Sequence, residues 1–184
     1  MREAVIVSTA RTPIGKAYRG SFNNTHAQTL AGHAISEAVK RAKVDPTDID
    51  DVILGAAAQQ GTQQGNIARQ SLLRAGLPTS VAGMSIDRQC ASGMMAIATA
   101  AKQIIDDGMN VTVGGGVESV SLVRNENFRI DNARDPWLEN EMPELYMTMI
   151  ETAETVADRY GISRERQDEY ALQSQIRTAH AQRN

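Results

Sequence analysis

Cys90 is the one residue in this 184-residue sequence whose type and position suggest covalent chemistry. It lies between an apolar run, Gly83–Asp87, and a long apolar helical pattern, Ala91 to about Asp107. A cysteine at the start of a helix is close to unpaired backbone N–H groups and to the positive end of the helix dipole. Both favour the thiolate, the form that acts as a nucleophile. Free cysteines are also among the most buried residues, so a purely structural role stays open.

A cysteine nucleophile usually needs a neighbouring base, and the sequence identifies none. The three histidines are His26, His33 and His180. His26 falls at an expected helix start, His33 on the polar side of the same helix, and His180 in the stretch Thr-Ala-His-Ala. We expect all three side chains to be exposed to solvent. The base that would activate Cys90 is therefore unassigned.

A second notable segment is Val113–Ser119, which reads VGGGVES. Glycines at the end of a strand permit positive φ and a close approach of the backbone. A phosphate-binding loop is one interpretation, but neither G-x-G-x-x-G nor G-x-x-x-x-G-K-[ST] occurs. We therefore expect a tight turn that packs near the active-site region. Met142, Met147 and Met149 offer flexible apolar side chains, either for a pocket or for packing.

Four short apolar or β-branched runs predict strands that are covered on both faces. They are Ala4–Ser8, Asp51–Gly55, Gly83–Asp87 and Asn110–Gly114. Helical patterns lie between them, so residues 1–117 read as an alternation of strands and helices. Such an alternation predicts the α/β class with a layered sheet.

Three helices are predicted between these strands. The first follows Thr25, where Thr25 and Gln28 have the spacing of a capping box. The second runs from Ile67 to Ala75 and stops at Gly76. The third is the helix after Cys90, which is apolar around most of its surface and is therefore expected to be buried. Beyond residue 121 the pattern becomes irregular, and helical signals return at Thr152–Tyr160 and after Ser163.

Composition excludes several classes of protein. The net charge is −3 with aromatic residues at 4%, which argues against a nucleic-acid partner. No apolar run is long enough to span a membrane. A single cysteine permits no intramolecular disulfide and argues against a zinc site, so we expect no metal and a cytoplasmic location.

Four separated segments together resemble the thiolases, which are acetyl-CoA acetyltransferases and 3-ketoacyl-CoA thiolases. They are VSTARTPIGKAYRGSF near the start, Cys90 with its flanks, GGGVESVS, and TAETVADRYGISRERQDEYALQSQ. The resemblance implies a thiolase-like layered αβα arrangement, the N-terminal half of a five-layered αβαβα core. It also implies that Cys90 carries the acyl group during reversible thiolysis and Claisen condensation of CoA thioesters, with no cofactor beyond these substrates.

The resemblance divides the chain into an N-terminal core domain, residues 1–121, and part of a loop domain, residues 122–184. Thiolases also have a C-terminal half with Gly-His-Pro, Asn-Glu-Ala-Phe and Cys-x-Gly motifs, and none of these occurs here. We therefore expect the complementary C-terminal half to complete the enzyme and to cover an unpaired sheet edge and an apolar face. A catalytically incomplete fragment that binds CoA or a partner is the alternative.

Two further implications concern the substrate and the assembly. Met149 matches a methionine that lines the acyl site in short-chain thiolases. Its neighbours Thr148 and Ile150 depart from the His-Met-Gly of those enzymes, which puts a strict acetyl selectivity in doubt. The family forms dimers or tetramers, with the strand before the nucleophile, here Gly83–Arg88, near the dimer contact.

Overall fold

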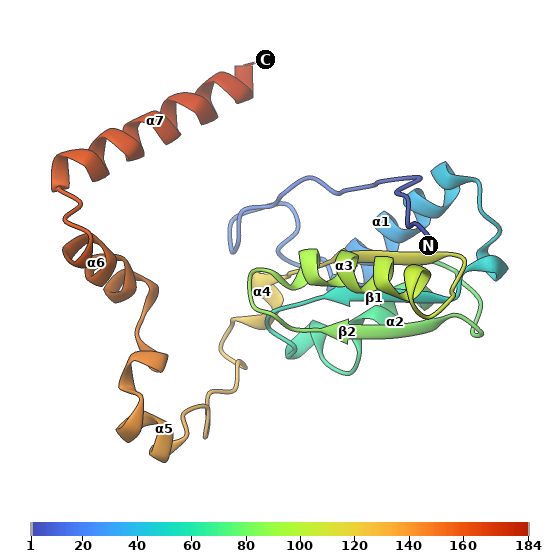
Figure 1. Cartoon of the computed structure of the whole chain (residues 1–184), viewed down its shortest axis with the longest axis horizontal. Coiled ribbons are helices and arrows are strands. Elements are labelled where there is room, and N and C mark those ends of the chain that lie inside the picture. The colour runs from blue at the N-terminus through green and yellow to red at the C-terminus, as the bar shows by residue number, and fades with distance from the viewer. Residues whose placement is uncertain (1, 184) are drawn as a thin grey trace. The chain divides into compact units, whose positions relative to one another are not determined.

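The structure of the chain, a computed structural model, describes residues 2–183. These residues divide into two units, residues 2–128 and residues 129–183 (Figure 1). A short helix that spans the predicted domain boundary at residue 121, α4 (Val120–Val123), belongs to the first unit, where Val123 is buried. The assignment of residues 122–184 to a loop domain stays a prediction.

The first unit is built on a three-stranded parallel sheet in the order β2-β1-β3. The strands are β1 (Asp51–Gly55), β2 (Ala82–Ile86) and β3 (Thr112–Gly116). They lie within two residues of three of the predicted runs. The central strand β1 is buried along its whole length, as a parallel strand with both faces covered should be.

Helices cover both faces of this sheet, which confirms the α/β class. Helices α1 (Ala27–Ala42) and α2 (Ile67–Arg74) lie on one face, and α3 (Ser92–Ile105) lies on the other. Alternate residues of β1 point to opposite layers. Val52 and Leu54 pack in the core with α1 and α2, whereas Ile53 packs against α3. Short 3-10 turns, Pro46–Asp48 and Gly61–Gln63, flank β1.

The prediction of a strand at Ala4–Ser8 is wrong for the described chain. These residues form no strand, and Ile6 is 78% exposed. The segment is anchored at its two ends, because Arg2 donates to the Gly108 carbonyl at 2.8 Å and Arg41 donates to the Thr9 carbonyl at 3.0 Å. A groove of about 530 Å³ separates residues 4–10 from β3. A strand needs a neighbour for its hydrogen bonds, and the groove leaves this segment without one.

The N-terminus of α1 is also capped differently from the prediction. His26 is the N-cap residue, and its side chain makes no capping hydrogen bond. The hydroxyl of Thr62 instead accepts the first backbone N–H, that of Ala27, at 2.9 Å. Thr62 in turn donates to Gln28 at 3.0 Å, so Gln28 supports the cap through a residue distant in sequence.

Helix α3 is less buried than its composition predicts. Only one stripe of small residues, Ser92, Ala96 and Ala100, is buried against the sheet. The opposite side is open, and Met94 there is 77% exposed. A helix that is apolar all round but covered on one side leaves a large apolar surface in contact with solvent.

The second unit consists of helices without a core of their own. It contains α5 (Pro136–Glu141), a 3-10 turn (Pro143–Tyr146), α6 (Met149–Arg159) and α7 (Arg164–Arg183). A capping box between Thr148 and Glu151 begins α6, and Gly161 with φ +61° follows its end. None of the described residues 129–183 is buried. Stability for helices of this kind comes from packing against other elements.

Candidate active site

Cys90 lies in the turn that connects β2 to α3. The strand ends at Ile86 and the helix begins at Ser92, so Cys90 precedes the first helical residue by two positions. Its side chain is exposed and is a free thiol. This agrees with the predicted position at a strand-to-helix turn and with an accessible thiol, whereas the alternative of a buried structural cysteine does not describe this structure.

The turn around Cys90 is sharply bent and held by hydrogen bonds. Gln89 has a φ of +47°, a left-handed conformation that is uncommon for residues other than glycine. Its N–H donates to the Asp87 carboxylate at 2.7 Å. The Ser92 hydroxyl accepts from the Arg88 N–H at 2.8 Å and donates to the Gln89 carbonyl at 2.6 Å.

The turn lies at the carboxyl ends of the parallel strands, where α/β proteins usually bind ligands. Gly55 ends β1 and is in register with Gly116, which ends β3. Both glycines lie against the first turn of α3. The N–H groups of that turn can stabilise a negative charge that develops beside the thiol. The arrangement suits a thiolate nucleophile that attacks a carbonyl carbon.

No histidine of the first unit lies on the same side of the sheet as this turn. His26 caps α1 and His33 lies on α1, which packs on the face opposite α3. His180 belongs to α7 in the second unit. All three side chains are exposed, as predicted. The described part of the first unit therefore offers Cys90 no histidine base.

The glycine run Gly114–Gly116 does not form the predicted turn. All three residues belong to β3, and none has a positive φ. Their small size serves a close packing of layers instead. A Cβ at Gly114 would lie 2.8 Å from the Cα of Ile97 in α3, a distance that real Cβ atoms essentially never show.

The residues that follow this run are fixed by a buried glutamine that the sequence reasoning missed. The Gln63 amide donates to the Glu118 carboxylate at 2.7 Å and accepts a short hydrogen bond from the Ser119 N–H. The other carboxylate oxygen of Glu118 accepts from the Ala57 N–H at 2.9 Å. Gln63 stands among four glutamines between residues 59 and 64, and nothing in the sequence distinguishes the buried one.

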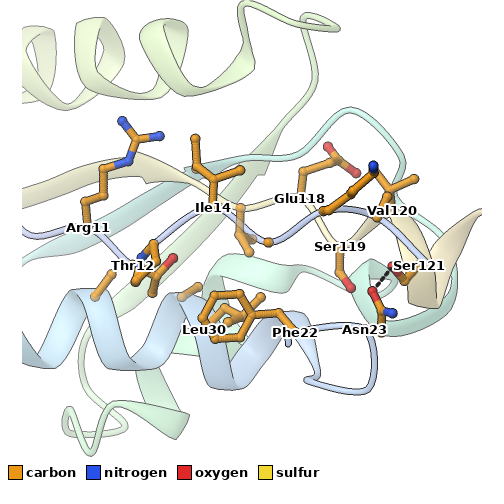
Figure 2. Close-up of a pocket in the computed structure, with 18 of the residues that line it drawn as sticks. Arg11, Thr12, Ile14, Phe22, Asn23, Leu30, Glu118, Ser119, Val120 and Ser121 are labelled. Atoms are coloured by element: carbon orange, nitrogen blue, oxygen red, sulfur yellow. Dashed lines mark hydrogen bonds between the residues drawn. The ribbon is translucent and has the colours of Figure 1, made fainter. Parts of the chain in front are cut away.

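A pocket of about 460 Å³ lies beside Glu118 and Ser119. Its walls are the loop 10–17, α1 and residues 116–121 (Figure 2). Figure 2 also shows Ser121 donating to Asn23, a contact of 3.1 Å that closes one end of the pocket. The loop that forms one wall of this pocket carries two cations, Arg11 and Lys16.

Met149, the predicted acyl-site residue, is the first residue of α6 in the second unit and is exposed. Its role stays a prediction. Met142 is likewise exposed in the second unit. Residues 2–183 contain no group of three or more histidine, cysteine or acidic side chains arranged to hold a metal ion. No described helix combines the length and the apolar character that crossing a membrane requires.

Comparison with known proteins places these features in a family. The family model described as "Thiolase, N-terminal domain" matches residues 4–184. The chain is 41% identical over 183 residues to a 3-ketoacyl-CoA thiolase of Bacillus subtilis (strain 168), covering 98% of this chain and 46% of that protein. It is 40% identical over 202 residues to a 3-oxoadipyl-CoA/3-oxo-5,6-dehydrosuberyl-CoA thiolase of Escherichia coli (strain K12), covering 99% and 49%.

A third relative is named for a different activity. It is an acetyl-CoA acetyltransferase of Cupriavidus necator, 37% identical over 193 residues, with 100% of this chain and 49% of that protein covered. The chain therefore spans about half the length of the curated relatives it matches.

Proposed function

Because the chain belongs to the thiolase family through its N-terminal domain, we propose that it is the nucleophile-bearing part of an enzyme that transfers acyl groups between CoA thioesters. The observation that carries this proposal is the exposed thiol of Cys90 in a fixed turn before α3. The names of the relatives support CoA thioesters as the substrate class.

In the proposed reaction, the Cys90 thiolate attacks the 3-keto carbon of a 3-ketoacyl-CoA. A bond forms between the sulfur and that carbon, and the bond between C2 and C3 of the substrate breaks. The electron pair goes to C2, which takes a proton and leaves as acetyl-CoA. The sulfur of a second CoA, having lost its proton, then attacks the acyl-cysteine, and the Cys90 thiolate leaves. The reverse sequence is a Claisen condensation.

The first turn of α3 supplies N–H groups that stabilise the oxyanion formed in each attack. The proton acceptor for Cys90 comes from outside the first unit, since its two histidines lie on the other face of the sheet. We assign this base to the complementary C-terminal half. That half is present in the relatives but not in this sequence, and it is either a second polypeptide or a continuation of this one.

Three uncovered surfaces support association with such a half. The open face of α3 exposes Met94, and Ile97 is partly exposed where α3 borders the groove beside residues 4–10. The outer edge of β3 has no strand partner among the described residues and borders the groove beside residues 4–10. The described part of the second unit has no buried residue. Surfaces of this kind are usually covered by a partner, because an open sheet edge and a large apolar patch promote aggregation.

The outer edge of β2 supports a further part of the proposal, a homodimer or tetramer. Strand β2 leads directly to the Cys90 turn and lies at the other edge of the sheet. A pairing of two copies along β2 would place the two nucleophile turns near the subunit contact. A reducing compartment such as the cytoplasm would keep Cys90 as a thiol.

The test is an intact-mass measurement after incubation with acetyl-CoA. The chain together with its complementary half is expected to gain one acetyl group on Cys90, and a Cys90→Ser variant is expected to gain none as a thioester. Hydroxylamine should remove the adduct, because a thioester is labile to it. The alternative, a fragment that binds CoA or a partner without turnover, would bind CoA but show no adduct in the completed protein, and that result would reject the acyl-transfer proposal.

A further inference from the structure

The backbone of α3 rests directly on the backbone of β1 at Gly55. A Cβ on Gly55 would lie 2.6 Å from the Gly93 nitrogen and closer still to the Ser92 carbonyl group. Real Cβ atoms essentially never come within 3.0 Å of such backbone atoms. A Cβ on Gly116, the register partner of Gly55 on β3, would lie 3.2 Å from the Gly93 Cα. The absence of side chains at Gly55 and Gly116 therefore sets how closely the first turn of α3 approaches the sheet.

Ser92 connects this close contact between α3 and Gly55 to the turn that carries Cys90. It is the first residue of α3 and is 4% exposed. Its hydroxyl accepts from the Arg88 N–H at 2.8 Å and donates to the Gln89 carbonyl at 2.6 Å. These two hydrogen bonds close a loop from Arg88 to Ser92, with Cys90 exposed within it. Two backbone hydrogen bonds close the same turn, from the Ala91 N–H to the Arg88 carbonyl at 3.0 Å and from the Ser92 N–H to the Gln89 carbonyl at 3.1 Å. Together these contacts hold Gln89 at a positive φ, a conformation that persists only where the surroundings enforce it.

We propose that Gly55 and Ser92 are positioning residues for Cys90. Gly55 lets the first turn of α3 lie directly on the end of β1, and the Ser92 hydroxyl then holds the preceding turn, so that Cys90 stays at the start of the helix. The inference rests on Cys90 being the reacting group of the proposed function. Its test measures alkylation of the thiol and needs no acyl transfer. The positioning role of Gly55 and Ser92 can therefore be rejected independently of the acyl-transfer proposal.

The first experiment compares Ser92→Ala with Thr99→Val in the 184-residue chain, in which Cys90 is the single cysteine. Thr99 is a matched control, because its hydroxyl also donates within α3, to the Met95 carbonyl at 2.8 Å, but lies away from the turn. The rate constant for alkylation by iodoacetamide is measured at one fixed pH, with circular dichroism to show that each variant is folded.

Ser92→Ala is expected to change the alkylation rate constant by about tenfold, because a turn that has lost the two Ser92 hydrogen bonds presents the Cys90 thiol to the reagent differently. Thr99→Val should react at the rate of the parent chain. Equal rate constants for folded Ser92→Ala and folded Thr99→Val would overturn the proposal.

The second experiment tests the close contact of α3 with Gly55. Gly55→Ala is expected to change the alkylation rate constant in the same way as Ser92→Ala. Gly115→Ala is the matched control, because a Cβ there would meet Leu54 Cδ2 at an ordinary 3.5 Å on the other face of the sheet. If neither Ser92→Ala nor Gly55→Ala folds, the parent chain is compared with itself in unfolding urea. Equal alkylation rate constants for the folded and the unfolded chain would show that the turn does not affect Cys90 and would overturn the proposal.

Discussion

The side-chain amide of Gln63 donates a hydrogen bond to the carboxylate of Glu118, 2.7 Å away, and joins the loop after β1 to the end of β3. The same side chain donates to the Ala58 carbonyl at 2.7 Å and accepts from the Ser119 N–H. Gln63 is fully buried, so its amide is shielded from solvent. Its hydrogen bonds add to the backbone bond from the Val117 N–H to the Gly55 carbonyl, 3.0 Å long, which also joins the ends of β3 and β1.

Replacing Gln63 by leucine is expected to destabilise the chain strongly. Each buried polar group left without a partner costs about 1–3 kcal/mol, and the substitution removes the partner of several groups at once. Gln64→Leu is the control, because Gln64 is exposed in the same loop and its replacement should change the free energy of unfolding by less than about 0.5 kcal/mol. Urea unfolding followed by circular dichroism measures both. Similar losses for the two variants would contradict the role of Gln63.

The open edge of β3 should gain protection from hydrogen exchange when the complementary half binds. The Val117 N–H donates to the Gly55 carbonyl, and the Asp50 N–H donates to the Val111 carbonyl. Backbone groups of a strand alternate in direction, so the N–H groups of Gly114 and Gly116 point to the open edge. Those two amides are expected to exchange quickly in the chain alone and slowly in the completed protein. The Val113 and Gly115 amides face β1 and serve as internal controls. Unchanged exchange at Gly114 and Gly116 would show that no strand pairs there.

A charge on the open face of α3 should prevent association with the complementary half. Met94→Glu places a carboxylate on the exposed side of the helix, where burial by a partner would leave it without water or a counter-charge. The unfolding free energy of the chain itself should change by no more than about 0.5 kcal/mol. Leu73→Glu, on the exposed surface of α2, is the control and should still bind the complementary half. Size-exclusion chromatography of each variant mixed with the complementary half measures complex formation. Normal complex formation by Met94→Glu would exclude this face of α3 from the contact.

The capping box of α6 should make part of the helix stability depend on pH. Hydrogen bonds from the Thr148 N–H, and then from its hydroxyl, lower the pKa of Glu151 below its ordinary value near 4.5. A carboxylate with a lowered pKa contributes stability that is complete above the ordinary value and is lost as the pH falls through the lowered one. Thr148→Ala should raise the pKa of Glu151 only partway, because the backbone N–H remains. An NMR titration of the Glu151 carboxyl in the parent chain and in Thr148→Ala measures this. A return to the full ordinary value would assign the effect to the hydroxyl alone.

Removing the thiol of Cys90 should abolish thiolysis in the completed enzyme. Cys90→Ala is expected to lower kcat by about a thousandfold or more, since a covalent nucleophile has no substitute in the reaction. KM for the acyl-CoA should change much less, because the thiol contributes little to binding. Thr99→Val is again a suitable control and should retain the parent activity. Retained activity in Cys90→Ala would reject the acyl-cysteine intermediate.

Local sequence patterns predicted the parts of the fold that depend on near neighbours. The β-branched run at Asp51–Gly55 is a fully buried strand, and the stop signals at Gly76 and Gly161 coincide with glycines at positive φ. The position of Cys90 before a helix followed from the same reasoning, because a strand pattern ends and a helical pattern begins on either side of it. These features depend on side-chain periodicity and backbone freedom, which are determined by residues that are close together in the sequence.

Predictions that depended on distant partners were the ones that failed. The run Ala4–Ser8 has the composition of a strand, but the groove beside β3 leaves it unpaired. Thr25 has the spacing of a cap, but Thr62 caps the helix because the fold brings its hydroxyl to the Ala27 N–H. The buried role of Gln63 could not be distinguished from that of its neighbouring glutamines, because burial is decided by what packs against a residue.

The amino-acid sequence by itself determined the α/β class, the limits of most elements to within a few residues, and the placement of one cysteine at a strand-to-helix turn. Only the tertiary structure decided which side of α3 is covered, how closely its first turn lies on Gly55, and which buried side chain joins β1 to β3. The physical reason is that helical and strand patterns are local properties of the chain. Close packing and the pairing of buried polar groups are instead properties of surfaces that meet only after the chain has folded.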